Sequence, residues 1–528
     1  MDLIRTSLEG QPAMALFLTI AVGYLVGEVD IKGFSLGVGA VLFVALAVGW
    51  FAPKTVPAAM VGTIGLALFL YAVGVQYGKQ FVLGLTSTAG RRANLIALAG
   101  VLSAGIVSLL IARTMGMDLG YALGLFAGSG TSTPTLQAAI ATLGNDDPAV
   151  GYSVSYPVGV AGPILFLYLG FRILKPKIDT APRVGMEMLE IALRNQDHFG
   201  RTLGEVMSAL PPQVKIVALR TGHHNQPAAR GHIVAENDVV LVVAPDKQVL
   251  EQARRNLGEA ASGRVFKDRS DLDYLRVFAS RPSVVGMPMG DLALPGDKAV
   301  VIAEIRRGDT NILPRPDLFL EFGDRVGMLA HRDDFSALRQ FFGDSIKGTA
   351  EFSYVSIGLG MALGFLLGAI QIPLPGIGTF SVGLSGVLIV ALVLGNLRRT
   401  GAINWTIPLS ANLVLRNLGL TLFLAQVGMA SGPKFAAAVT QSGLQMFGLG
   451  ALVMAALVLP ILIIGLGVYR MPLDEVAGIV SGACGSAVLA YSNRVMPTDR
   501  SDIGYAMIYP ATTIAKILFV SIFPSLVQ

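Results

Sequence analysis

The chain has 528 residues, of which 53% are hydrophobic and only 14% are charged, and its formal net charge is +5. Its mean hydropathy of +0.63 is far too high for a water-soluble chain of this length, so a soluble globular protein is excluded. The single cysteine, Cys484, excludes an internal disulfide.

Apolar stretches that suit membrane helices recur along the chain. The first six lie at about 13–27, 35–51, 57–77, 94–112, 119–142 and 152–174. Six more lie at about 352–370, 381–397, 405–427, 443–468, 473–492 and 504–525. Each is close to the ~20 residues that a helix needs to cross the hydrocarbon core. We therefore expect an α-helical polytopic membrane protein.

The two sets of stretches are copies of one unit. IGLALFLYAVGVQYGKQF, which starts at Ile64, matches LGLTLFLAQVGMASGPKF, which starts at Leu418, at an offset of 354 residues. With a slip of one residue, Tyr156-Pro157 matches Tyr509-Pro510. A membrane protein built from two copies of one unit is most often a transporter whose substrate site lies where the copies meet.

A charged segment of different character separates the copies. It is itself duplicated, at an offset of 86 residues: IVALR from Ile216 matches IAEIR from Ile302, and NDVVLVVAPD matches GDRVGMLAHR. Alternating β-branched runs and closing helices at 247–257 and 333–342 predict two small α+β modules. The predicted domains are a first transmembrane repeat, two modules and a second transmembrane repeat, over residues 1–175, 176–265, 266–348 and 349–528.

Basic loop residues predict the orientation. We place the N-terminus outside, with five crossings per copy and the fifth stretch of each copy folded as a re-entrant hairpin. Thirteen Lys and Arg residues then lie in inside loops and four in outside loops, a positive-inside bias. An odd number of crossings inverts the second copy and places the modules inside. If the fifth stretch crossed, the copies would be parallel and the bias would weaken.

The fifth stretch of each copy is predicted to break at its centre. The centres read GSGTSTP from Gly128 and GACGS from Gly482, and Gly and Pro interrupt helices. Freed backbone groups survive at membrane depth only inside protein or beside a wet cavity, and half-helix N-termini there suit an anion. Close helix packing is the alternative reading. The predicted substrate-binding residues here are Gly128, Ser129, Gly130, Thr131, Ser132, Thr133, Pro134, Gly482, Cys484, Gly485 and Ser486.

Two cations, Arg416 and Lys516, lie within predicted spans, where no Asp or Glu is found at comparable depth. Intramembrane charge is costly and usually functional, so both residues are candidates to bind an anionic substrate, Arg416 before Lys516. Pairing with backbone carbonyls is the alternative for Arg416. For Lys516 the alternative is snorkelling towards an interface.

Other chemistries lack their motifs. There is no complete phosphate-binding loop, and no Cys/His set has zinc-ligand spacing. We therefore expect no enzyme activity, no cofactor, no metal and no nucleic-acid partner. A ligand-gated channel and a membrane sensor remain as alternative functions.

The repeated GxxxFLxxxGxxxGxxF-like stretches, GSGTSTPT, the repeated Tyr-Pro and the tandem modules resemble the aspartate:alanine exchanger family over essentially the whole chain. The resemblance implies a multi-pass transporter of the bacterial inner membrane with periplasmic termini and a cytoplasmic insert. It implies antiport of an acidic amino acid or dicarboxylate against a smaller amino acid or anion, by alternating access of the elevator type. The modules resemble TrkA-C domains, which implies a small regulatory ligand and a homodimer.

Overall fold

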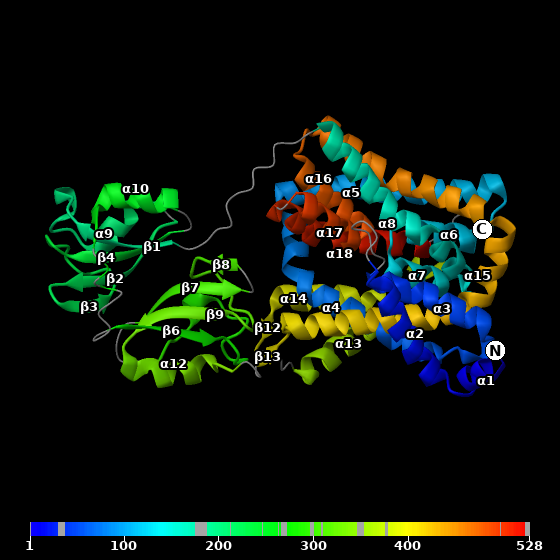
Figure 1. The fold of residues 1–528 in the computed structure, drawn as a ribbon, viewed down its shortest axis with the longest axis horizontal. Coiled ribbons are helices and arrows are strands. Elements are labelled where there is room, and N and C mark those ends of the chain that lie inside the picture. Colours follow the sequence, from blue (N-terminus) through cyan, green and yellow to red (C-terminus); the bar gives the residue numbers. More distant parts are fainter. Residues whose placement is uncertain are drawn as a thin grey trace. The chain divides into compact units, whose positions relative to one another are not determined.

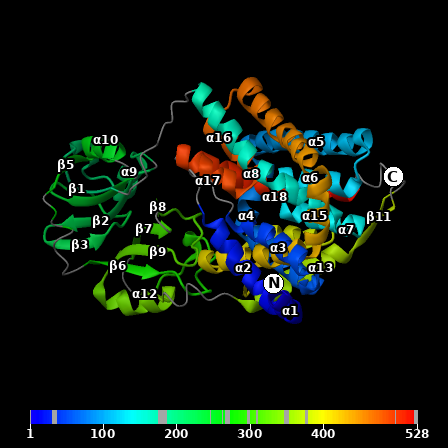
Figure 2. The ribbon, with the colours of Figure 1, turned by 45° about the vertical axis from the view of Figure 1, so that its right-hand side comes forward.

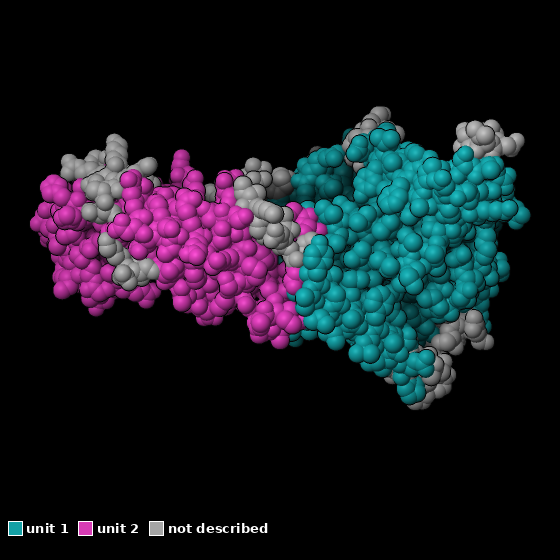
Figure 3. Space-filling model, turned by 90° about the horizontal axis from the view of Figure 1, so that it is seen from below, with its two compact units in different colours: residues 1–179, 354–397, 412–528 teal, residues 180–353, 398–411 magenta. Residues whose placement is uncertain are grey.

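The computed structural model describes residues 2–29, 37–174, 187–211, 213–244, 247–261, 263, 265, 272–295, 300–307, 310–345, 353–374, 378–496 and 498–522. The chain divides into two compact units, which Figure 3 shows in different colours. Unit 1 is helical and comprises Met1–Asp179, Tyr354–Leu397 and Asn412–Gln528. Unit 2 comprises Thr180–Ser353 and Arg398–Ala411. The predicted domain boundaries fall on or beside residues outside the described ranges.

The first copy in unit 1 is a series of helices (Figure 1). They are α1 (Asp2–Gly10), α2 (Pro12–Gly27), α3 (Ala40–Phe51), α4 (Ala59–Thr86), α5 (Thr88–Met115), α6 (Leu119–Ser129), α7 (Thr133–Leu143) and α8 (Asp147–Leu174). The second copy comprises α13 (Tyr354–Ala369), the hairpin β10 (Gln371–Leu374) and β11 (Gly378–Ser381), α14 (Ser385–Leu397), α15 (Leu409–Leu462), α16 (Leu473–Cys484), α17 (Ser486–Val495) and α18 (Asp499–Ile522). Among the described residues, five helices are long and apolar enough to cross a membrane. The polytopic fold class is thereby confirmed.

One predicted division is wrong. The helical parts of the stretches 405–427 and 443–468 are not separate helices but lie on one continuous helix, Leu409–Val468, which consists of α15 and a short π-helical end and changes direction along its length (Figure 1). In the first copy, Ser87 accepts a hydrogen bond from the Gly90 amide and caps the start of α5. At the equivalent place in α15, Thr440 and Ser442 instead donate back to carbonyls of the preceding turn. The helical ladder therefore continues without a cap.

The two copies cross at equivalent glycines. A Cβ on Gly65 of α4 would lie 2.6 Å from the carbonyl oxygen of Gly419 of α15, and a Cβ on Gly419 would meet Gly65 in return. These glycines are 354 residues apart, so each copy presents the same residue at the crossing. Only glycine permits the two backbones to come this close.

The insert in unit 2 contains two modules with the same strand order. The first has β1 (Glu187–Leu193), α9 (Leu203–Ser208), β2 (Lys215–Thr221), β3 (His224–Pro227), β4 (Val239–Ala244), α10 (Lys247–Leu257) and β5 (Gly258–Ala260). The second has β6 (Asp273–Phe278), β7 (Val301–Arg307), β8 (Thr310–Ile312), β9 (Arg325–Ala330) and α12 (Phe335–Phe342). The sheet orders are β3-β2-β4-β1-β5 and β8-β7-β9-β6. The predicted closing helices are confirmed as α10 and α12.

The duplication extends to irregular features. The register shifts between Ile216 and Ala218 in one module and between Ile302 and Glu304 in the other, 86 residues later. The two sheets share an apolar core, and Figure 2 shows α10 and α12 on their outer sides. The Lys215 ammonium also donates to the Ile302 carbonyl at 3.0 Å. The α+β insert is thus two joined copies of one module.

Candidate functional site

The fifth stretch of each copy is divided into two helices at the predicted place. α6 ends at Ser129 and α7 begins at Thr133, while α16 ends at Cys484 and α17 begins at Ser486. The helices of each pair contact each other. We call residues 129–133 the first tip and 484–486 the second tip. Their backbone groups leave the helical ladder, as the glycines in both segments favour.

The two tips touch. The hydroxyl of Thr131 donates a hydrogen bond to the carbonyl of Cys484. A Cβ on Gly485 would lie 2.5 Å from the same hydroxyl oxygen, so glycine leaves room for the contact. The two halves of the repeat therefore meet through the breaks in their fifth stretches, where the sequence predicted the substrate site.

Lys516 of α18 joins the first and second hairpins. Its ammonium donates to the carbonyl of Gly130 at 3.2 Å and to the carbonyl of Ala483. The side chain is 3% exposed, so it does not reach an interface by snorkelling. Within the described part of the chain, no carboxylate pairs with it. A buried cation held only by neutral carbonyls can take an anionic ligand as a stronger partner.

The remaining predicted residues of the first hairpin hold its shape. Ser129 donates to the Gly450 carbonyl of α15 at 2.9 Å, and Ser132 and Thr135 share a hydrogen bond of 2.6 Å. Pro134 lies in the first turn of α7, where its missing N–H costs nothing. Close packing of α6 against α8 explains Gly128: a Cβ there would meet the Tyr152 carbonyl and the Ser155 hydroxyl.

The second tip is more open than the first. Ser486 is exposed, whereas its equivalent Ser132 is 7% exposed. Cys484 contributes its carbonyl, and its side chain is 1% exposed. The Gly482 carbonyl accepts a hydrogen bond from the Thr512 hydroxyl of α18 at 2.8 Å. The Ser486 hydroxyl at the second tip is therefore exposed, while the Ser132 hydroxyl at the first tip is buried.

Arg416 belongs to a different cluster. Its guanidinium contacts the side-chain oxygen of Gln76 at 3.5 Å, and Asn412 donates to the same oxygen at 3.1 Å. Tyr77, the next residue along α4 after Gln76, lies near Arg416, and its ring packs against Tyr505 and Tyr509. Among the described residues, Arg416 contacts members of this cluster and neither of the two tips.

The sequence prediction missed the tyrosines of this cluster. YSVSYP from Tyr152 and YAMIYP from Tyr505 both place two tyrosines four residues apart before a proline. Tyr152 and Tyr156 also pack together, with ring centroids 5.5 Å apart. The repeated pattern thus produces an aromatic pair in each copy.

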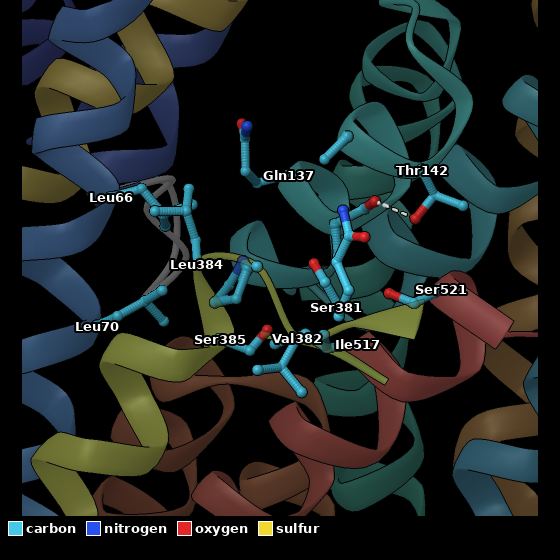
Figure 4. A pocket seen from close by; sticks show the side chains of 15 residues that line it. Leu66, Leu70, Gln137, Thr142, Ser381, Val382, Leu384, Ser385, Ile517 and Ser521 are labelled. Atoms are coloured by element: carbon cyan, nitrogen blue, oxygen red, sulfur yellow. Dashed lines mark hydrogen bonds between the residues drawn. The ribbon is translucent and has the colours of Figure 1, made fainter. Parts of the chain in front are cut away.

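A cavity of about 340 Å³ begins beside the first hairpin (Figure 4). Leu66 and Leu70 line one side of it, and Thr142 and Ser521 lie on another. It reaches Pro134, at the start of α7. None of the described residues that line it is charged, and hydroxyl and amide groups supply its polarity: Gln137, Thr142, Gln371, Ser381, Ser385 and Ser521.

Comparison with known proteins identifies the membrane part. Residues 15–171 and 356–525 match the Asp-Al_Ex family model, described as a predicted permease membrane region. The chain belongs to the aspartate:alanine exchanger family. Residues 275–343 match the TrkA-C domain, so the second module of this exchanger-family protein is a TrkA-C domain. The match does not include the first module, whose likeness to this domain rests on the shared strand order.

Relatives of this family member align along nearly its whole length. An uncharacterized transporter from Geobacter sulfurreducens is 36% identical, with 97% of each chain covered. One from Symbiobacterium thermophilum is 37% identical, also with 97% of each covered, and one from Corynebacterium efficiens is 34% identical over 96% of each. This chain is accordingly a membrane transporter.

Proposed function

We propose that the protein is a secondary antiporter that exchanges an acidic amino acid or dicarboxylate for a smaller amino acid or anion. The observation that carries this proposal is Lys516, a buried ammonium that bridges both hairpins through the neutral carbonyls of Gly130 and Ala483. A substrate carboxylate would replace weak acceptors by a charge-assisted hydrogen bond. It would also loosen the link between the hairpins, which connects substrate binding to movement.

The same proposal assigns roles to the other groups. The Ser486 hydroxyl and the backbone at the second tip contact the solute, and the cavity beside Pro134 forms part of its path. Arg416 receives a second carboxylate, or the same one at another stage of transport. Alternating access of the elevator type would carry one hairpin past the other. Each hairpin is re-entrant, the first from the outside and the second from the cytoplasm.

We place the protein in the bacterial inner membrane, with periplasmic termini and a cytoplasmic insert. The positive-inside bias supports this orientation. The TrkA-C domain supports a small regulatory ligand on the insert and a homodimer.

Counterflow in proteoliposomes tests the function. Vesicles are loaded with one member of a panel of amino acids and dicarboxylates, and uptake of a labelled member is measured. An antiporter shows uptake that is accelerated by substrate on the opposite side. An uptake rate that is the same with and without internal solute indicates a channel. The absence of flux for every member of the panel would favour a sensor.

Accessibility of the second tip tests the site. Ser486→Cys in a Cys484→Ala background should react with a small thiol reagent, and transported solute should slow the reaction. Ala490→Cys, one turn along the exposed side of α17, is the control. Equal reaction rates at Ser486→Cys with and without solute would remove the second tip from the path.

A further inference from the structure

The segment 398–411, which is the loop between α14 and α15 together with the first three residues of α15, clusters with the insert. We call it the coupling linker. It contains the short hairpin β12 (Arg399–Thr400) and β13 (Ile403–Asn404), and its residues belong to unit 2 together with the modules. The linker is therefore held by the second module while both of its ends continue as helices of unit 1.

Arg398 attaches the start of the linker. Its guanidinium pairs with Glu321 at 3.3 Å and lies 4.9 Å from the ring centre of Phe319. The side chain is only 12% exposed. Glu321 also pairs with Arg307 at 2.8 Å, and Arg307 in turn pairs with the fully buried Asp324. The attachment is thus connected through Arg307 to Asp324, a fully buried carboxylate of the second module.

Two further contacts fix the hairpin of the linker. Arg399 donates to the Pro282 carbonyl at 2.9 Å, and the amide of Asn404 donates to the Val285 carbonyl at 3.3 Å. Asn404 is 8% exposed and Trp405 is 5% exposed. The Trp405 indole donates to the Thr400 hydroxyl at 2.9 Å, which closes the hairpin on itself. Several independent contacts make the linker and module a single body.

The other end of the linker leads directly to the Arg416 cluster. α15 begins at Leu409 within unit 2 and continues without interruption into unit 1. Arg416 follows Ala411 by five residues, or about 8 Å along the helix axis. Between them in the chain, Asn412, which is 3% exposed, donates a hydrogen bond to the side chain of Gln76 of α4. A helix transmits displacement along its axis because its hydrogen bonds resist stretching.

We propose that the coupling linker transmits movements of the second module to α15 and thereby determines the positions of Asn412 and Arg416 relative to Gln76. The connection is mechanical and requires no particular transported solute. A ligand that shifts the second module would act on transport through this one segment. The inference does not rest on the proposed antiport, since it concerns the order of α15 and can be measured without substrate.

A reversible attachment tests the proposal. A Cβ on Gly286 would lie 3.9 Å from the Cβ of Arg398, close to the mean of ~3.8 Å in disulfides. Gly286→Cys with Arg398→Cys, in a Cys484→Ala background, removes the Arg398–Glu321 pair and permits a covalent replacement. Hydrogen exchange of the full-length protein in lipid nanodiscs is then followed in residues 409–417, oxidised and reduced.

Reduction should raise exchange in 409–417 about tenfold above the Cys484→Ala parent, and oxidation should restore the parent rate. Arg398→Cys alone should give the raised rate in both states. Arg315→Ala, which breaks an exposed pair on the same module, should exchange like native protein. Parent-like exchange in the reduced double variant, or no recovery on oxidation, would overturn the proposal.

A second variant covers the case in which Gly286→Cys, at a φ of +79°, does not fold. Arg399→Ala combined with Glu321→Gln loosens the linker without cysteines. It should raise exchange in 409–417 and increase the exposure of Trp405 to a fluorescence quencher, while exchange in β7 and β9 stays at the native rate. Unchanged exchange in 409–417 together with a dislodged Trp405 would show that linker and helix are not coupled.

Discussion

Thr131 and Gly485 occupy equivalent positions in the two copies, 354 residues apart, and both have positive φ, +43° and +107°. A β-branched residue at positive φ is unusual and costs on the order of 1–2 kcal/mol. The hydroxyl of Thr131 offsets part of this cost through its bond to the Cys484 carbonyl. The two strained turns therefore support each other at the point where the copies meet.

This relationship predicts coupling between the two positions. Gly485→Ala should lower the thermal stability of the protein by about 1–3 kcal/mol, because its Cβ would meet the Thr131 hydroxyl and its φ is unfavourable. Thr131→Ala in the same protein should recover part of the loss. The unfolding of the two single variants, Gly485→Ala and Thr131→Ala, and of the double variant in detergent measures this. Gly467→Ala, whose Cβ would meet nothing within 4 Å, is the control, and strict additivity of the two changes would contradict the coupling.

Removing the charge of Lys516 should strongly weaken the binding of a dianionic solute. Lys516→Met keeps the length of the side chain but loses the bonds to the Gly130 and Ala483 carbonyls. Apparent affinity for the dianion should fall about a hundredfold, and that for a zwitterion less. Counterflow kinetics measure both. Thr513→Val, a buried change on the same helix, should transport normally, and an equal loss for both solutes would point to a purely structural lysine.

Arg416→Ala should weaken uptake of the dianion on the order of a hundredfold if the guanidinium binds a carboxylate during transport. Arg416→Lys keeps the charge but loses the planar fork, so it should recover only part of the affinity. Gln76→Leu is the matched control: it removes the side-chain amide that Arg416 contacts but leaves the charge of Arg416 in place. If Arg416 acts on the substrate and not only on local structure, Gln76→Leu should lower the affinity for the dianion less than Arg416→Ala does. Native affinities in Arg416→Ala protein that inserts normally would assign the anion to Lys516 and the tips alone.

The orientation predicts opposite labelling of two sites. In a Cys484→Ala background, Gln226→Cys in β3 should resist a membrane-impermeant thiol reagent added to intact cells and react after lysis. Lys54→Cys, between α3 and α4, should react in intact cells. Gln528, a natural choice for the C-terminus, lies outside the described residues. Labelling of Gln226→Cys from outside would disprove the cytoplasmic insert.

The capping box of α9 predicts a pH dependence in the insert. The backbone N–H of Thr202 donates to Glu205 and lowers the pKa of that carboxyl below its usual 4.5. Because the folded pKa is lowered, the contribution is fully present above pH ~4.5 and is lost as pH falls through the folded pKa. Exchange of the α9 amides, corrected for the intrinsic rate, should rise over that range in native protein. Glu205→Gln should show a smaller rise, and the same rise in both would contradict the assignment.

Local features of this protein could be predicted because they depend on residue type and spacing. The 354-residue and 86-residue repeats are visible as matching letters, and the matching modules have matching strands and bulges. Gly130 and Gly485 predict the helix breaks because glycine weakens a helix wherever it occurs. The continuous α15 could not be predicted from the sequence. Serine and threonine hydroxyls can either cap the start of a new helix or donate to a carbonyl of the preceding turn, and Thr440 and Ser442 do the second.

The sequence by itself determined the membrane class, the two repeats, the inserted modules and the residues at which the helices break. Only the tertiary structure decided that Lys516 joins the hairpins, that Arg416 belongs with Gln76 and that residues 398–411 pack with the insert. Lys516 and Gly130 are hundreds of residues apart in the chain. Whether such groups meet depends on how each helix is rotated and packed against its neighbours, and that is set by the sum of many weak contacts and not by any one motif.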